Sequence, residues 1–351
     1  MTTKITVSNT ATLAELQAAV DAFDIVDFAA GETFQLTGYL SITTPTTLTT
    51  TAGNPATIRR AVGNNRAVVL NAANINISNL TFDFNFAGGW EDFAALLTFN
   101  IPSGDNQTQN IISGARIYGV DFIDSAGTVT HSGNGDSWGI VFTNDAAAGV
   151  QDVKVIGCRM LAPNRQLTAG GAGGGVHGCE IAYCYVKDGR NNSIAISNRF
   201  NDGTEGDDVL SNINIHHNML IGNFSTGVFV GRDGSDDPDI DVSMANVTIA
   251  DNYLELRPGS TQFAKGILVK SGTSADSGFL GVSILRNKIV NAPADSITTR
   301  IVDVKGPAAG TSSVTIQDNE CLGRTGYNID NLTIIQSGNT NNRIPFTFLS
   351  S

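Results

Sequence analysis

One polar segment carries the densest set of side chains that could do chemistry. It reads "VHGCEIAYCYVKDGRNNSIAISNRF", residues 176–200, and its candidate catalytic residues are His177, Tyr183, Asp188 and Arg190. A guanidinium such as that of Arg190 can hold a carboxylate through two hydrogen bonds, and an imidazole or a phenol can transfer a proton. The segment therefore indicates acid–base chemistry on an acidic substrate. The alternative is that "DGRNN" serves only as a turn, for which its residue types are also suited.

Two acid-rich stretches offer a second kind of chemistry. They read "NDGTEGDD" from Asn201 and "RDGSDDPDID" from Arg232. The candidate calcium ligands in the second stretch are Asp233, Asp236, Asp237 and Asp239. Clustered carboxylates can hold Ca²⁺, and two carboxylates roughly 5 to 9 Å apart can hydrolyse a glycosidic bond. The alternative is that these acids only solvate the surface; apart from Ca²⁺ we expect no cofactor.

The composition of the chain excludes several classes of protein. Of its 351 residues 41% are hydrophobic and 15% charged, which argues against disorder. The net charge of −12 repels phosphate backbones, so a nucleic-acid partner is not expected. No apolar run approaches the roughly 20 residues of a membrane span, so membrane insertion is not expected either. The N-terminus has no basic region followed by an apolar one, and we therefore expect no signal peptide.

A phrase that returns along the chain predicts the fold. "NINIHHNMLIG" from Asn212 recurs as "NVTIADNYLEL" from Asn246, "GVSILRNKIVN" from Gly281 and "SVTIQDNECLG" from Ser313. Apolar residues two positions apart in each copy have the periodicity of a strand. A second short strand, such as "GVFVG" from Gly227, lies between copies. Short strands that return in the same order, joined by Gly, Asn and Asp turns, predict a parallel β-solenoid.

One column of the aligned copies predicts a ladder of side chains inside the solenoid. It reads Leu80, Val120, Cys158, Cys184, Asn218, Asn252, Asn287 and Asn319. Because stacked coils lie about 4.8 Å apart, the four Asn amides could each bond to the next. We also expect these Asn residues to take the left-handed backbone conformation of the turn. The four cysteines (Cys158, Cys179, Cys184 and Cys321) all occupy inward columns, which favours buried thiols over reactive or metal-binding ones.

The N-terminal region has the pattern of a capping helix. "TLAELQAAVDAFDIVDFAAGETFQLTGYLSITTPTTL" begins with a capping box formed by Thr12 and Glu15. Leu13, Leu16, Val20 and Phe23 then give the helix one apolar face, which could cover the open end of the first coil. This segment resembles the entrance of the pectin-lyase-like right-handed parallel β-helix superfamily, where a short helix caps the first coil.

The resemblance extends over nearly the whole chain in architecture. It implies an all-β protein, a right-handed parallel β-helix of about nine to ten coils with an N-terminal capping helix and an internal Asn ladder. We expect a single domain over residues 1–351. Within it, residues 1–30 would form an N-terminal strand and the capping helix, 31–340 the coils, and 341–351 a C-terminal tail.

The resemblance also implies that a substrate lies across the first strand type of each coil, such as "WGIVF" from Trp138. The candidate substrate-binding residues on or beside these strands are Trp138, Asn192, Arg199, Phe229, Arg232, Lys265, Lys270 and Lys305. Cations gathered near one face of an acidic protein favour a polyanionic ligand, such as a uronate-containing polysaccharide. The alternative is that they are ordinary solvated cations, some of them paired with Asp303 and neighbouring acids.

The resemblance does not extend to the polygalacturonases. The "GDD" at Gly206 is similar to their paired aspartates, but here it leads into "VLSNINI", a strand of the second type. The position that would match those aspartates holds Arg190, Asn191 and Asn192. We therefore do not expect polygalacturonase chemistry.

The chain is similar instead to phage tailspike depolymerases and bacterial polysaccharide lyases. As a group, β-helix lyases and epimerases use Arg, Lys, His or Tyr to move the sugar C5 proton, while a cation or Ca²⁺ neutralises the uronate. The resemblance therefore implies carboxylate binding for Arg190 and proton transfer for His177 or Tyr183. The resemblance further implies a virion or extracellular protein, a homotrimer, that binds and depolymerises an acidic polysaccharide, as a lyase rather than a hydrolase. The alternative function is non-catalytic: adhesion, or a structural part of a virion.

Overall fold

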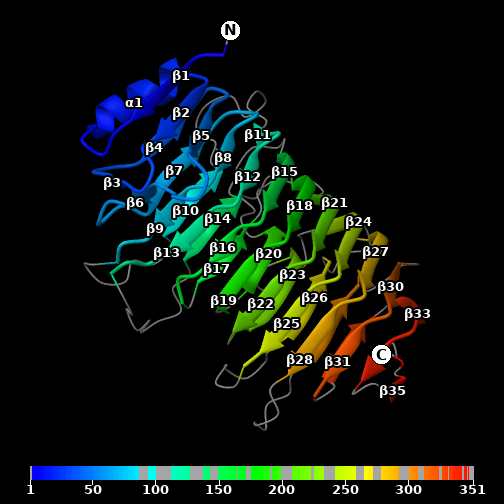
Figure 1. Cartoon of the computed structure of the whole chain (residues 1–351). Helices are drawn as coiled ribbons and strands as arrows, with labels where there is room; N and C mark the ends of the chain where they lie inside the picture. The colour runs from blue at the N-terminus through cyan, green and yellow to red at the C-terminus, as the bar shows by residue number, and fades with distance from the viewer. Residues whose placement is uncertain are drawn as a thin grey trace.

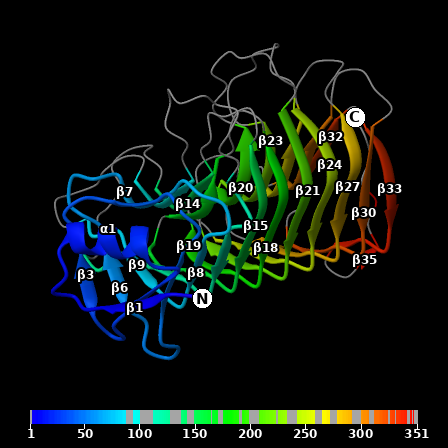
Figure 2. The same ribbon diagram turned by 90° about the horizontal axis from the view of Figure 1, so that it is seen from above.

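The computed structural model shows a stack of coils whose strands form three sheets (Figure 1). It describes residues 2–86, 94–99, 112–126, 137–142, 149–163, 165–170, 175–189, 192–198, 208–222, 225–232, 242–257, 265–271, 278–291, 300–306, 312–323, 326–330, 332–341, 344–345 and 347. The colours run from blue to red along the stack in both views (Figures 1 and 2), so consecutive coils are neighbours in space.

Sheet A consists, in order, of β1 (Lys4–Val7), β2 (Ile25–Phe28), β5 (Thr47–Thr50), β8 (Asn76–Ser78), β12 (Arg116–Tyr118), β15 (Val150–Ile156), β18 (Val176–Ala182), β21 (Asp208–His216), β24 (Val242–Ala250), β27 (Phe279–Leu285), β30 (Ser313–Gln317) and β33 (Thr333–Ser337), with β11 (Ile112–Ser113) paired to β15. Sheet B consists of β3 (Thr33–Gln35), β6 (Thr57–Arg59), β9 (Thr81–Asp83), β13 (Asp121–Ile123), β16 (Arg159–Met160), β19 (Tyr185–Gly189), β22 (Met219–Gly222), β25 (Tyr253–Leu256), β28 (Lys288–Asn291), β31 (Glu320–Leu322), β34 (Thr340–Asn341) and β35 (Ile344–Pro345).

Sheet C consists of β4 (Leu40–Ile42), β7 (Arg66–Leu70), β10 (Ala95–Phe99), β14 (Trp138–Phe142), β17 (Gln166–Ala169), β20 (Asn192–Asn198), β23 (Thr226–Arg232), β26 (Lys265–Lys270), β29 (Arg300–Lys305) and β32 (Gly326–Asp330). Each coil runs from sheet C through sheet A to sheet B, as β20, β21 and β22 do. The strand pairs of the described residues are parallel, apart from β34 with β35 at the C-terminal end. The predicted right-handed parallel β-helix is confirmed, and the ten strands of sheet C agree with the nine to ten coils expected.

Inward side chains from successive coils form one continuous core. Val153, Cys179, Ile213 and Val247 follow one another in register, as predicted, and are at most 1% exposed. The four cysteines are buried free thiols, as expected. Burial raises the pKa of Cys179 and of Cys321 to about 12. These thiols therefore pack as small apolar groups and are poor nucleophiles.

The internal ladder is present at the corner between sheets A and B. Each amide group donates to the next coil's side-chain oxygen: Asn218 Nδ2 to Asn252 Oδ1 at 2.9 Å, Asn252 to Asn287 at 3.0 Å and Asn287 to Asn319 at 3.0 Å. A fifth member, Asn339, accepts from Asn319 Nδ2 at 3.1 Å, and the sequence alignment missed it. The same side-chain oxygens also accept hydrogen bonds from backbone N–H groups. The ladder therefore gives hydrogen-bond partners to its own buried amides and to the backbone of the turn.

The left-handed backbone of this corner lies one residue earlier than predicted. The residues with positive φ are Asn79, Gly119, Gly157, Tyr183, His217, Asp251, Arg286, Asp318 and Gly338, each preceding a member of the column that holds the ladder. The expectation that the ladder Asn residues would take this conformation was therefore wrong. They are buried at 1–2% exposure from Asn218 to Asn319, whereas the left-handed residues turn their side chains outward, as Tyr183 does at 61% exposure.

The helix α1 (Leu13–Ala22) covers the first coil, as predicted. Its capping box is complete: Glu15 N donates to Thr12 Oγ1, and Thr12 N donates to Glu15 Oε2. Gln17, which the sequence did not single out, binds the edge strand of sheet C through both backbone groups of Ser41, at 2.7 and 2.9 Å. This closes part of an edge that could otherwise pair with another chain. Among the described residues no helix is long and apolar enough to cross a membrane.

Two buried arginines fix the corner between sheets B and C in the early coils. Arg60 and Arg165, 0% and 2% exposed, place their guanidinium carbons 4.9 and 4.8 Å from the centre of the Phe86 ring. Arg165 Nη2 also lies 3.7 Å from Asp124 Oδ2. Burial nevertheless raises the pKa of Asp124. Such an arrangement of cations over an aromatic ring stabilises a corner that brings together distant segments of the chain.

Removing one amide from the ladder should cost more stability than any surface change. In Asn287→Leu, the backbone and side-chain N–H groups of Asn252 lose their shared acceptor and Ile249 O loses a donor while staying buried. Asn319 Oδ1 loses one of its two donors and keeps the backbone N–H of residue 287. We expect a loss of at least about 3 kcal/mol of unfolding free energy by chemical denaturation. The control is Asn214→Ala, on the outer face of sheet A, for which about 0.5 kcal/mol or less is expected. Equal losses in the two variants would contradict a stabilising ladder.

Candidate functional site

The outer face of sheet C brings together residues from successive coils. Its first column contains Trp138, Gln166, Asn192, Thr226, Lys265 and Arg300 in register. From the sequence, Trp138, Asn192 and Lys265 of this column were predicted to bind substrate, and Gln166 was missed because strand β17 was missed. That strand carries Thr168 where its neighbours in register carry Ile140 and Ile194, so its apolar pattern is weak. The hydroxyl of Thr168 bonds instead to the backbone of Ala195, at 3.2 Å.

The second outward column is apolar over most of its length. It contains Thr98, Val141, Ala169, Ala195, Phe229, Leu268 and Asp303 in register. Val141 and Ala169 join Ala95 and Trp138 in an apolar cluster separate from the main core. Trp138 is 6% and Phe229 3% exposed, although both lie on the outward side of the sheet. This face therefore offers apolar surface with little access to water.

A buried ion pair adjoins the apolar column. Lys265 Nζ lies 2.9 Å from Asp303 Oδ2, and the side chains are 21% and 0% exposed. The two residues come from neighbouring strands, β26 and β29, so the pair joins two coils. A carboxylate as deeply buried as that of Asp303 must be paired to remain charged, which fixes the position of the Lys265 ammonium group.

Cations predominate on these two strands. Lys270 of β26 is in register with Lys305 of β29, so two like charges stand side by side. Lys265 is in backbone register with Arg300, and β29 also carries the carboxylate of Asp303. Like charges on neighbouring strands repel, and Asp303 offsets the charge of Lys265.

The predicted catalytic residues lie on different faces of the coil. His177 is on sheet A, where its Nδ1 is 2.8 Å from Ser211 Oγ. Tyr183 is at the exposed corner between sheets A and B. Asp188 is on sheet B, where its Oδ1 is 3.0 Å from Arg257 Nη1. Arg190 lies outside the described residues; in the sequence it belongs to the two-residue connection 190–191 between β19 and β20.

The other predicted site residues are also distributed over different parts of the chain. Asn192, Phe229, Lys265, Lys270, Lys305 and Trp138 are all on sheet C, as expected. Lys187, a cation of the same polar segment 176–200, is in β19 of sheet B. Arg232 ends β23, with only its backbone described. Arg199 and the proposed calcium ligands Asp233, Asp236, Asp237 and Asp239 lie outside the described residues. Within the described part of the chain, no group of three His, Cys, Asp or Glu side chains could hold a metal ion.

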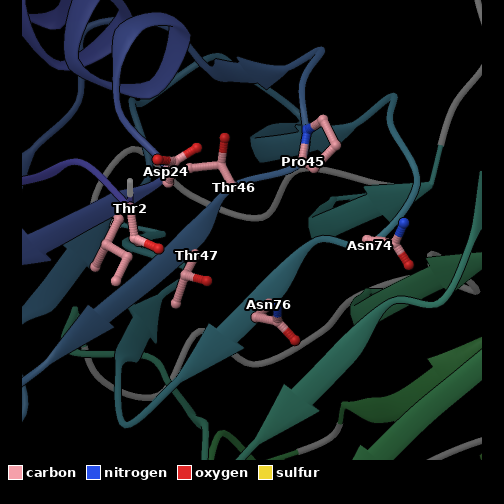
Figure 3. A pocket seen from close by; sticks show the side chains of 8 residues that line it. Thr2, Asp24, Pro45, Thr46, Thr47, Asn74 and Asn76 are labelled. Carbon is pink, nitrogen blue, oxygen red and sulfur yellow. The ribbon is translucent and has the colours of Figure 1, made fainter.

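A hollow of about 440 Å³ lies at the N-terminal end of sheet A (Figure 3). It is lined by Thr2, Asp24, Thr46, Thr47, Asn74 and Asn76, among others, at the starts of β2, β5 and β8. Its one carboxylate, Asp24, already accepts hydrogen bonds from Thr3 N and Oγ1, which lower the pKa of Asp24. The hollow thus has short polar side chains and little apolar surface, unlike sheet C.

Comparisons with known proteins agree with the fold. No family model matches the sequence, and no curated protein matches it. A mutant tailspike protein of E. coli bacteriophage HK620, in complex with a pentasaccharide, has a similar structure at a TM-score of 0.58 and 12% identity, covering 96% of this chain and 64% of that one. The GH136 lacto-N-biosidase from Eubacterium ramulus gives 0.52 and 12%, covering 96% and 67%. The Dettilon tailspike protein gives 0.50 and 13%, covering 97% and 67%.

These identities establish the architecture and leave the activity open. The chain spans about two thirds of the length of each of these proteins. Together with its parallel sheets and ladder, the likeness defines the fold as a right-handed parallel β-helix.

The Lys265–Asp303 pair should behave as a buried ion pair. In Lys265→Met the Asp303 carboxylate stays buried without the ammonium group, and we expect a loss of about 3 kcal/mol in unfolding free energy. Replacing both residues, as Lys265→Met with Asp303→Leu, should restore most of that loss. Chemical denaturation of the two single variants and the double variant measures the coupling. Additive effects would show that the two charges do not interact.

Proposed function

We propose that this protein binds an acidic polysaccharide along the outer face of sheet C and depolymerises it. The observation that carries the proposal is the arrangement of Lys265, Lys270, Arg300 and Lys305 on β26 and β29, in a chain whose net charge is −12. Phe229 and Leu268 lie in the adjoining column. Cations beside apolar surface suit a polymer whose units carry both carboxylates and apolar sugar faces.

The geometry of the sheet suits a polymer better than a small molecule. Each coil presents its outward residues in the same columns, about 4.8 Å from those of the next coil. A chain of sugars lying along the stack would meet one set of side chains per coil. The apolar faces of its rings could pack on Leu268, and its carboxylates could approach Lys270 and Lys305.

Cleavage requires a residue that neutralises the uronate and another that moves a proton. Arg190 is the predicted catalytic residue that this proposal retains, because the connection 190–191 leads directly to Asn192 in sheet C. A guanidinium there would hold a uronate carboxylate through two hydrogen bonds. His177, Tyr183 and Asp188 have their partners on other faces, and Lys265 with Asp303 is a described pair on sheet C that could take part in proton transfer.

The likeness to tailspikes supports a further part of the proposal. Two of the similar structures are phage tailspike proteins, and one of them holds a pentasaccharide. We extend this to attachment to a virion or release outside the cell, and to a trimeric assembly. A Ca²⁺ site formed by Asp233, Asp236, Asp237 and Asp239 belongs to the same proposal.

The second candidate function is that of a non-catalytic adhesin or a structural part of a virion. The apolar column from Val141 to Leu268 favours it, because an apolar face can form a protein interface. In that function the protein would bind without turning over any polymer.

A panel of polysaccharides separates these functions. The purified protein is incubated with acidic and neutral polymers while reducing ends and the ultraviolet absorbance of unsaturated uronates are followed together. We expect both signals to rise with one acidic polymer, as for a lyase. Reducing ends alone would indicate a hydrolase. Binding without either signal would favour the adhesin, and neither binding nor cleavage by folded protein would contradict the proposal. Arg190→Ala should abolish turnover while the protein remains folded.

The cationic part of sheet C predicts a specific loss of affinity. In Lys305→Gln one positive charge is removed from the face that contains β26 and β29. We expect affinity for the acidic polymer found in the panel to fall about two- to fivefold at low salt, and the difference to shrink at high salt. The matched control is Lys288→Gln, on sheet B, which should leave affinity unchanged. An equal loss in the control would show that only overall charge matters.

A further inference from the structure

The left-handed corner between sheets A and B carries three side chains larger than Asn or Asp, namely Tyr183, His217 and Arg286. The positive φ is therefore a property of the turn in this column and does not single out one residue. What distinguishes Tyr183 is an aromatic ring that is 61% exposed. A large exposed aromatic side chain offers a surface on which a ligand can pack.

The ring of Tyr183 is held from its downstream side. His217, in the next coil of the same column, stacks on it with centroids 5.1 Å apart and planes at 28°. His216 meets it edge-on at 5.7 Å. Because one face of the ring is covered by the downstream coil, its other face is turned toward the upstream coil, where the column contains Gly157.

A chain of contacts holds these imidazoles in place. His216 Nδ1 is 2.9 Å from His217 Nδ1, and His216 Nε2 is 3.1 Å from Glu180 Oε1. Glu180 Oε2 in turn lies 2.9 Å from Lys154 Nζ, and this bond to Lys154 lowers the pKa of Glu180. Both ring nitrogens of His216 therefore have hydrogen-bond partners. These contacts hold His216 and His217 in position against the Tyr183 ring.

Upstream of Tyr183 the same corner is hollow. Gly119 and Gly157 occupy the left-handed positions there, and a Cβ added to Gly157 would meet no atom closer than 4.0 Å. The hollow measures about 260 Å³ and is lined by Pro55, Asn79, Gly119, Asp121, Gly157 and Arg159, among others. It is smaller than the roughly 300–1,000 Å³ clefts that hold drug-sized ligands.

The polar groups of the hollow balance one another. Arg159 Nε donates to Asp121 Oδ1 at 2.6 Å, and a second bond joins Arg159 Nη2 to Asp121 Oδ2. The bonds to Asp121 raise the pKa of Arg159. A charged ligand would compete with this pair, whereas hydroxyl groups could bond to its outer edges and to the amide of Asn79.

We propose that the hollow and the upstream face of Tyr183 form a second saccharide site, separate from sheet C, that takes a neutral sugar unit. The apolar C–H face of a sugar ring would pack on the phenol ring, and its hydroxyl groups would bond to Asp121, Arg159 and Asn79. The choice of a saccharide rests on the function proposed for sheet C. Such a site would hold a polymer on a face different from the one that cleaves it.

Ring signals of tyrosine test this site directly. The protein is labelled with ¹³C in its tyrosine rings, and the signals of Tyr183 are assigned by their loss in Tyr183→Phe. Cellohexaose and maltohexaose are the neutral probes, and trigalacturonate is the acidic one. We expect a neutral probe to shift the Tyr183 signals, and Gly157→Asn to weaken its binding by about tenfold. Asn tolerates positive φ, so that variant fills the hollow without straining the turn.

The matched control is Asp318→Asn, in the same left-handed column but several coils away. It should bind the neutral probe as the wild type does. No shift of the Tyr183 signals with any probe, or no effect of Gly157→Asn, would overturn the second site.

Sheet C is followed separately, through Trp138 fluorescence in a Trp90→Phe background. A response of Trp138 to trigalacturonate without any Tyr183 shift would overturn the second site and leave the proposed function standing. A Tyr183 shift with neutral probes and no response of Trp138 to trigalacturonate would support the second site and contradict the proposed function of sheet C.

Discussion

The structure depends on the hydrogen-bonded corner between sheets A and B. There a left-handed residue turns the chain, and the buried residue after it bonds to the same position of the next coil, from Asn218 to Asn339. A slip of one residue in any strand would exchange its inward and outward side chains. The ladder opposes such a slip, because each of its amides would then be buried without a partner. Register in the coils from Asn218 to Asn339 follows from this corner, whereas the same column of the earlier coils packs through Leu80, Val120, Cys158 and Cys184.

The register between coils determines which side chains lie next to one another on the surface. On sheet C it aligns Lys265 with Arg300 and Lys270 with Lys305, and it lets Asp303 pair with the lysine of the preceding coil. At the A–B corner the same alignment places Gly157 and Tyr183 at the same position of successive coils. The two surfaces differ in chemistry: the first is cationic and apolar, and the second is aromatic with balanced charges.

The repeated phrase was sufficient to predict the coils and the ladder, because each depends on residues at a fixed place in the repeat. The capping helix was predicted separately, from its capping box and its apolar face. The features that the repeated phrase missed lack that regularity. Strand β17 has Thr168 at an apolar position. Arg60 and Arg165, which both contact the Phe86 ring, come from distant parts of the sequence. The contact of Gln17 with Ser41 likewise joins two elements that no spacing rule relates.

The candidate catalytic residues illustrate a limit specific to this fold. Residues 176–200 look like one cluster in the sequence, but they run through β18, β19 and β20 and so pass all three sheets. Neighbours in sequence therefore face different directions, while residues one coil apart stand side by side. His177 and Asp188 are on separate faces for this reason, and Lys265 and Asp303 meet although far apart in the chain. Alignment of coils is thus a better guide to a site than local density of polar residues.

Hydrogen–deuterium exchange with and without an acidic polysaccharide tests most directly the claim that sheet C is the binding face. The account predicts slower exchange in peptides that contain β20, β23, β26 and β29, with β22, β25 and β28 of sheet B unchanged. Protection confined to sheets A or B, or no protection by any acidic polymer, would contradict it.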